Sequence, residues 1–455
     1  MNISIWVANT RDLIQPTEDH KGISRYANLG SEIYNSKNEN WQSDGRKLVS
    51  AFLTEQIGQI STLTFTISKE NFGYISIEGR NTQVWVFDYD RSNPYETDTS
   101  YPYVMFAGHV INVVESIDKS GVITKTVTCA DNIDYLNDTI LTRARFTLTD
   151  GVTSVDILDR IIREHEEKKL GVRIEADKDW QRVLSSFGSF PDCTPYTNAY
   201  EYVIDWEPAF RFIQEWCEKW GYEWTLAPIA HYEEPAPENP PYRMFVFFGD
   251  KGTFNKTSSV VLKDGVNIQS LTVHKDESNL ITRMYPIGAS KMGTAHITYV
   301  KISPESVTPQ TPNIHVSSEF NCVDDDLAIA EYGVIEARQD WEDVTVANNL
   351  KTKALNAMEN RKGTKIEYSG TFLDLSGNEH PQDLFMVGDT HNLKHDVLKI
   401  NVNVRIMYLK RNLLEPWKVE MKLGDVFENR EQQQYLYALK STNERTDLMK
   451  LIENN

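Results

Sequence analysis

The sequence contains little cysteine and no long apolar run. Its four cysteines are far apart and form no C-x-x-C pair: Cys129, Cys193, Cys217 and Cys322. This spacing excludes a disulfide scaffold and a zinc finger, and it is typical of a protein that folds in a reducing cytosol. The most apolar run, 244–248, is far shorter than a membrane span, and the N-terminus lacks the pattern of a signal peptide. We therefore expect a soluble protein without stable membrane insertion.

Positive charge is also scarce. The 455 residues include 47 Lys and Arg against 66 Asp and Glu, so the net charge is −19. A protein that holds nucleic acid without sequence preference needs a cationic surface, and this composition disfavours that class. The apolar share of 40% and the charged share of 25% exclude wholesale disorder. The length fits about three domains.

Alternation of apolar and polar residues predicts that β-strands dominate the fold. In 62–67 and again in 123–129, apolar residues alternate with threonines, as half-buried strands require. The strongest alternation predicts an antiparallel hairpin of strands 397–408 and 417–423. Five residues of this hairpin are predicted to fill a barrel core: Ile400, Val402, Val404, Val419 and Met421.

Helical spacing is less frequent. It predicts helices at 154–168, 208–220 and 344–360, and a further helix in the last 25 or so residues. Residues 227–242 contain five prolines and three glutamates, which predicts an exposed loop.

No motif in the sequence establishes catalysis. The segment 288–293 differs from G-x-S-x-G in the position of its second glycine, so we interpret it as a turn after a strand. His165 and Glu166 begin an H-E-x-x-H motif that lacks its second histidine. No phosphate-binding or dinucleotide-binding fingerprint occurs. We therefore predict no catalytic residue and no cofactor.

Metal and sugar sites are also not favoured. His391 and His395, with His380 nearby, have ligand spacing, but we interpret them as solvated loop histidines. The acidic run 324–326 lacks the spaced ligands of a calcium loop and favours an acidic turn or a helix start. The aromatic stretch 190–206 favours packing or an interface over sugar stacking. We predict no metal site.

Several segments, in order, resemble one family. Six stretches carry the resemblance: 106–110, 129–136, 279–288, 330–376, 386–390 and 417–425. They include Phe-Ala-Gly-His-Val, Asp-Asn-Ile-Asp-Tyr-Leu, Thr-Arg-Met-Tyr-Pro-Ile-Gly and Met-Val-Gly-Asp-Thr. Together they are similar to phage and prophage tail-tip hub proteins, which are also described as prophage tail endopeptidase, tail-associated lysin N-terminal region or minor structural protein.

The resemblance implies an α+β, β-rich hub with two tandem β-barrel-like domains, small α/β domains and a C-terminal helix. We place a barrel-like domain at 1–130 and an α/β domain at 131–268. A second barrel-like and α/β region follows at 269–425, and a helical tail at 426–455. Three chains with two barrels each would present six similar units to a six-fold tail tube.

The resemblance also implies partners and a location. The expected partners are two further copies in a homotrimer, a distal tail protein ring, a tape measure protein and receptor-binding proteins. DNA would pass through transiently without specific binding. The protein would reside in the virion, at the tail tip or baseplate, after synthesis in the host bacterial cytoplasm. From the acidic composition we expect a channel lined by acidic and uncharged polar residues, with acids spread over the outer surface as the alternative.

Many family members continue into a lytic or host-binding part, whereas this chain ends at Asn455, so we expect no enzyme activity. Two other functions stay open at this point. One is a peptidoglycan-degrading tail endopeptidase, and the other is a host-carbohydrate-binding tail protein.

Overall fold

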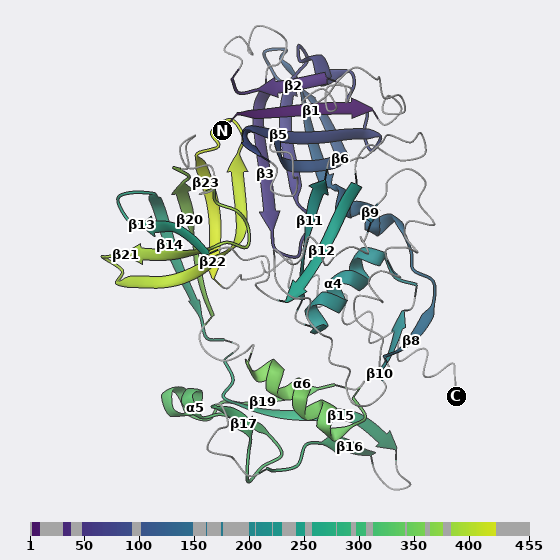
Figure 1. Ribbon diagram of the computed structural model, residues 1–455, viewed down its shortest axis with the longest axis vertical. Helices are drawn as coiled ribbons and strands as arrows, with labels where there is room; N and C mark the ends of the chain where they lie inside the picture. Colours follow the sequence, from purple (N-terminus) through teal and green to yellow (C-terminus); the bar gives the residue numbers. More distant parts are fainter. Residues whose placement is uncertain are drawn as a thin grey trace. The chain divides into compact units, whose positions relative to one another are not determined.

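The structure is a computed structural model with two compact units (Figure 1). It describes residues 2–9, 31–37, 48–92, 102–148, 161, 174–175, 200–204, 206–220, 222–229, 243–250, 257–278, 280–292, 297–305, 313–341, 344–359, 365–375 and 384–424. The first unit combines Met1–Thr272 with Tyr368–Gly424, and the second combines Val273–Glu367 with Asp425–Asn455. Both units are therefore discontinuous in sequence. The four-part division expected from the sequence stays a prediction.

The first unit contains one large sheet. Its strands follow the order β14 (Ile268–Asp276), β20 (Lys365–Leu373), β23 (Lys418–Gly424), β22 (Ile400–Asn412), β3 (Leu48–Gln56), β4 (Thr62–Ser68), β7 (Ile123–Asp131), β6 (Pro102–Ile117), β5 (Thr82–Ser92), β1 (Ile3–Asn9) and β2 (Ser31–Asn35). Figure 1 shows β1 and β5 running across the direction of β3, so the sheet curls on itself. The predicted β-rich fold is confirmed.

The concave side of this sheet holds the core. Leu63, Phe65 and Ile67 of β4 are fully buried, as are Val127 and Cys129 of β7. The threonines between them are half-buried on the other side. The alternation in 62–67 and 123–129 therefore predicted both the strands and their buried faces.

The C-terminal hairpin differs from its prediction. The first half of β22 pairs with β21 (Thr390–His395), and only the second half pairs with β23. A register shift between Ile406 and Tyr408 turns the following residues over, so that Leu409 and Leu413 are buried. Val402 lies in the first half and is 37% exposed. Its predicted place in the core is therefore wrong: it shares a face with the buried Val404 and Ile406, but it lies in the exposed stretch 401–403 near the start of β22.

The rest of the hairpin prediction is confirmed in part. Val404, Val419 and Met421 are buried, whereas Ile400 is half-buried. Since Val402 and Val404 lie two residues apart on one face of the strand, they form a matched pair for testing where burial begins along it.

We expect Val404→Asp to lower the free energy of unfolding by more than about 3 kcal/mol, because it places an unpaired carboxylate in a site that is 6% exposed. Val402→Asp should cost less than about 1 kcal/mol, because its carboxylate reaches water. Denaturant unfolding of both variants measures the difference. Equal losses would contradict the difference in burial between the two sites.

The first unit also carries helical and smaller sheet elements. The helix α4 (Ala209–Trp220) confirms the prediction for 208–220, and it buries Phe212, Ile213 and Trp216. One small sheet has the strand order β11 (Tyr222–Ile229), β12 (Arg243–Asp250) and β9 (Ile174–Glu175), with β12 in the middle. Another pairs β10 (Tyr200–Ile204) with β8 (Ala144–Leu148). Residues 227–229 belong to β11, so the predicted loop 227–242 begins too early. The predicted helix 154–168 lies outside the described residues except for the helical, buried Ile161.

The second unit is a sheet covered by a helix. The sheet contains β16 (Ile297–Lys301), β15 (Arg283–Met292), β18 (Val323–Asp325), β17 (Ile314–Val316) and β19 (Glu336–Asp340). The helix α6 (Ala347–Glu359) confirms the prediction for 344–360 and buries Leu350, Ala354 and Met358 against the sheet. A short helix, α5 (Asp326–Tyr332), follows β18. The predicted C-terminal helix lies outside the described residues.

Candidate functional site

The convex face of the large sheet is free of charge over four strands. The register of β3, β4, β7 and β6 aligns twelve uncharged residues on this face: Ser50, Phe52, Thr54, Thr62, Thr64, Thr66, Asn112, Val114, Ser116, Thr124, Thr126 and Thr128. We call this set the threonine face. The chain carries a charge on 25% of its residues, so a run of this size without charge is a distinct feature.

Hydroxyl groups bond across the strands of the threonine face. The Oγ1 atoms of Thr66 and Thr126 are 3.0 Å apart, and the hydroxyl oxygens of Ser116 and Thr124 are 2.9 Å apart. Such cross-strand pairs stabilise the sheet. On the β22 side the face ends at Lys410, whose ammonium lies 5.1 Å from the centre of the Phe52 ring. A face of this kind neither attracts nor strongly repels a polyanion.

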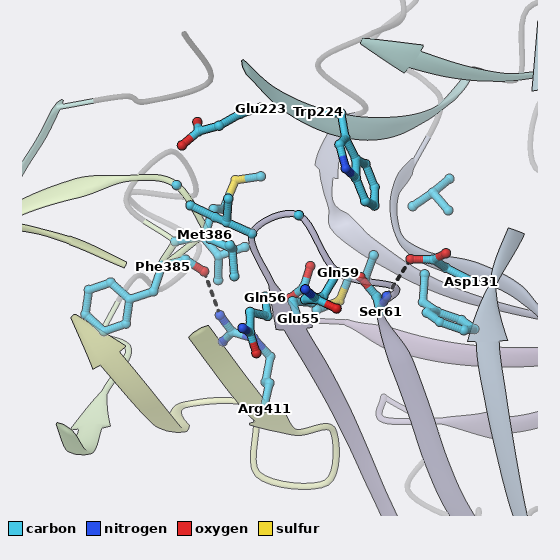
Figure 2. Close-up of a pocket in the computed structure, with 18 of the residues that line it drawn as sticks. Glu55, Gln56, Gln59, Ser61, Asp131, Glu223, Trp224, Phe385, Met386 and Arg411 are labelled. Atoms are coloured by element: carbon cyan, nitrogen blue, oxygen red, sulfur yellow. Dashed lines mark hydrogen bonds between the residues drawn. The ribbon is translucent and has the colours of Figure 1, made fainter. Parts of the chain in front are cut away.

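A polar pocket lies at one end of the same sheet (Figure 2). Its volume is about 160 Å³, and its wall comes from the end of β3 with the β3–β4 turn, β6, the end of β7, β11, the segment 384–388 and β22. Elements far apart in sequence therefore form it together. Two arginines hold these elements in place.

Arg411 holds the segment 384–388 from inside the unit. It is 1% exposed, and its guanidinium donates to Asp374 Oδ2 at 2.9 Å, to the carbonyl of Pro416 at 2.7 Å and to the carbonyl of Phe385 at 3.0 Å. Asp374 is also buried, so the ion pair is closed to water. These bonds tie the strand β22 to Asp374, to the turn at Pro416 and to the segment 384–388, whose Gly388 N–H also donates to the carbonyl of Ile406 at 2.8 Å.

Arg405 connects β22 to β11. Its guanidinium donates to both carboxylate oxygens of Glu223, at 2.7 Å for Oε2, and its Nε donates to the carbonyl of Gly388 at 2.9 Å. Bidentate pairs of this kind fix orientation as well as distance. The small sheet that carries β11 is thereby joined to the strand β22.

Two carboxyl groups in the pocket have raised pKa values. Burial raises the pKa of Glu55 to about 7, although the nearby Arg411 charge opposes this shift. Burial likewise raises the pKa of Asp131 to about 7, against the hydrogen bonds that it accepts from the backbone N–H groups of Ser61 at 2.7 Å and Ile133 at 3.1 Å. Both groups therefore change charge near neutral pH.

The raised pKa of Glu55 predicts a pH dependence of stability. The folded protein holds this proton more tightly than the unfolded chain, so stability falls as the pH rises from about 4.5 to about 7. Glu55→Gln removes this contribution. Relative to the wild type, we expect the variant to gain about 2 kcal/mol between pH 5 and pH 8.

Denaturant unfolding at several pH values measures this effect. Glu70→Gln is the matched control, because Glu70 is exposed in a turn. Parallel pH curves for the wild type and Glu55→Gln would contradict the burial of this carboxylate.

The histidines with ligand spacing belong to a strand and not to a loop. His391 is buried in β21, where its Nδ1 lies 3.0 Å from the carbonyl oxygen of Val260 and its ring meets Phe385 edge to face. The prediction of a solvated loop is therefore wrong for His391, because the chain forms β21 here and the ring is buried against Phe385. His395 ends the same strand, and His380 lies outside the described residues. Among the residues that the structure describes, no three histidine, cysteine or acidic side chains form a group that could hold a metal ion.

The sequence favoured either an acidic turn or a helix start for the run 324–326, and the structure shows a helix start. Asp325 accepts a hydrogen bond from the Ala328 N–H at 3.1 Å and so caps α5. Asp324 instead binds Arg283 through two bonds of 2.7 and 3.0 Å. Both acids therefore have structural partners.

The other predicted sites give two corrections. Residues 288–292 of the glycine-bearing segment lie inside β15, so our interpretation as a turn is wrong. His165 and Glu166 lie outside the described residues. Of the aromatic stretch 190–206, the structure describes 200–204, which form β10, and Trp206, which is 63% exposed.

Two of the resemblance motifs meet in the structure. His109, from the 106–110 motif, is fully buried and stacks on Tyr135, from the 129–136 motif, with ring centres 4.2 Å apart. Its Nε2 lies 3.2 Å from Asp134 Oδ2, and this close approach of His109 lowers the pKa of Asp134. Both motifs therefore have a structural role in joining β6 to the end of β7.

These features define a β-rich protein whose most distinctive surface is an uncharged sheet face. Residues 255–434 match the family model described as prophage endopeptidase tail. No curated protein matches the chain. Among the described residues, no helix is long and apolar enough to cross a membrane.

Two of the solved structures with a similar fold are tail proteins. The 43 kDa tail protein of prophage MuSo2 from Shewanella oneidensis is 12% identical, and the match covers 93% of this chain and 98% of that chain with a TM-score of 0.54. The tail protein from Neisseria meningitidis MC58 is 10% identical, with 93% and 97% covered and a TM-score of 0.50. The predicted resemblance to phage tail proteins is therefore confirmed.

Proposed function

We propose that this phage tail protein is a tail-tip hub that closes the tail tube as a homotrimer and opens to let DNA pass. The match of residues 255–434 to the prophage tail family carries the proposal. The fold that the chain shares with tail proteins over 93% of its length supports it. The hub would connect the distal tail protein ring with the tape measure protein and would reside at the tail tip of the virion.

The threonine face supports the proposed conduit. A channel wall that bound phosphate through lysine and arginine would hold DNA by counterion release and slow its passage. The hydroxyl-rich residues of this face offer no such charge. We assign the wall of the channel to this face, in line with the expected lining of acidic and uncharged polar residues.

Three copies of the chain would match a six-fold tube if each provided two equivalent barrels. The curled sheet of the first unit is one candidate for a barrel. The second barrel and the boundaries 1–130, 131–268, 269–425 and 426–455 belong to this proposal.

The proposed role is structural and not enzymatic. The word endopeptidase in the family description names an activity that needs a nucleophile or a metal. The three described cysteines are buried, and burial raises the pKa of Cys217 to about 12 and that of Cys322 to about 11. A buried thiol with a raised pKa is a poor nucleophile.

A reconstruction of the assembled tail tip tests the proposal. We expect three copies of the chain, with Thr64 and Thr126 facing the central axis. Six copies, one copy, or lysines and arginines that outnumber acids along the axis would contradict it. Clearing of cell walls by the purified protein in a zymogram would contradict the structural role.

A further inference from the structure

The pocket of Figure 2 holds more negative charge than its surroundings neutralise. Five charged side chains line it: Glu55, Asp131, Glu223, Arg405 and Arg411. Glu223 is bound by Arg405, and Arg411 is bound by Asp374, which lies outside the lining. Within the described part of the chain, Glu55 and Asp131 take part in no ion pair. The pocket is therefore short of positive charge.

The two unpaired carboxylates differ in their hydrogen bonds. Asp131 accepts from two backbone N–H groups, whereas the carboxylate of Glu55 accepts no hydrogen bond from another described group. Figure 2 shows Glu55 at the end of β3, beside Gln56 and near Gln59 of the following turn, in the middle of the lining. A carboxylate in such a place has its full acceptor capacity available to a ligand.

An aromatic ring completes the lining. Trp224 is 7% exposed, and its indole points from β11 toward the turn that carries Gln59 and Ser61. A flat aromatic face favours a flat cation, because guanidinium groups stack on rings and also donate two parallel bonds to a carboxylate. The volume of about 160 Å³ gives room for one side chain.

We propose that this pocket binds an arginine side chain of a neighbouring tail protein, whose guanidinium pairs with Glu55 and Asp131 and packs against Trp224. The identity of the neighbour as a tail protein rests on the proposed function. The chemistry of the ligand rests on the pocket alone. The pocket would thereby bind a cation carried by the partner. The net charge of −19 on the present chain also favours basic partners.

Calorimetric titration of the purified full chain tests this proposal. The probe is Nα-acetyl-arginine N-methylamide, and the citrulline analogue serves as its uncharged isostere. We expect the arginine probe to bind at one site at pH 8 and the citrulline analogue to bind at least about tenfold more weakly. Between pH 8 and pH 6 the affinity should fall by at least about tenfold, because Glu55 and Asp131 both become protonated around pH 7.

Variants locate the site. Glu55→Gln should weaken binding of the arginine probe about tenfold at pH 8 and remove the share of the pH dependence that comes from Glu55, leaving that of Asp131. The exposed Glu70→Gln should change neither the affinity nor its pH dependence. Equal binding of both probes, or an unchanged affinity in Glu55→Gln, would overturn the proposal. Tighter binding of spermidine than of the arginine probe would also overturn the proposal, because it would show that the pocket prefers a free polyamine as its ligand. These measurements use the isolated chain and do not depend on assembly. The arginine proposal can therefore fail while the hub proposal holds, and the hub proposal can fail while the chain still binds arginine.

Discussion

Replacing Asp374 by alanine is expected to lower the free energy of unfolding by about 3–5 kcal/mol, because it leaves the guanidinium of Arg411 buried without its counter-charge. Arg411 is 1% exposed and the Asp374 side chain is 0% exposed, so water cannot replace the lost partner. The same change should loosen the segment 384–388, because Arg411 positions the carbonyl of Phe385. Denaturant unfolding gives the loss of stability.

A double variant measures how strongly Asp374 and Arg411 depend on each other for stability. Asp374→Leu combined with Arg411→Met should be far more stable than either single change, since apolar side chains of similar volume replace a buried ion pair at little cost. Glu420→Ala is the surface control, because the Lys410–Glu420 pair spans 3.5 Å in solvent and should contribute less than about 1 kcal/mol. Additive losses in the double variant would show that the pair is not coupled.

Gly108→Ala is expected to lower the free energy of unfolding by about 3 kcal/mol or more, because the added methyl group has no space. A Cβ atom at this position would lie 2.1 Å from the carbonyl oxygen of Ala130 and 2.6 Å from Cζ of Phe106. The carbonyl belongs to the neighbouring strand β7 and cannot move without breaking the ladder. Thermal or denaturant unfolding measures the cost.

Gly58→Ala provides the control for this prediction. Gly58 has a φ angle of +68° in the β3–β4 turn, and a Cβ atom there would meet nothing within 4 Å. Its cost should be only the backbone strain of about 1–2 kcal/mol. A smaller loss for Gly108→Ala than for Gly58→Ala would contradict the close approach of β6 and β7.

The motifs behind the family resemblance now have physical explanations. The glycine of Phe-Ala-Gly-His-Val is required by the approach of β7, and Asp131 begins its motif by capping the turn that follows. The arginine of Thr-Arg-Met-Tyr-Pro-Ile-Gly binds Asp324 within the second unit. Because these residues serve the fold, the sequence pattern identified a family of structures and not a catalytic centre.

The sequence by itself determined the features that depend on near neighbours. Two kinds of local pattern were enough to predict strands and helices: alternation at 62–67 and 123–129, and helical spacing at 208–220 and 344–360. A strand or helix with one buried face shows its period in its own sequence. Composition likewise determined the acidic charge.

Only the tertiary structure decided the features that join distant segments. The exposed start of β22 leaves Val402 outside the core, and His391 is buried in β21, although neither appears in a local pattern. The pocket brings Glu55, Asp131 and Arg411 together from three separate stretches of chain. Burial and charge pairing depend on which strands become neighbours, and that choice is made by the whole sheet.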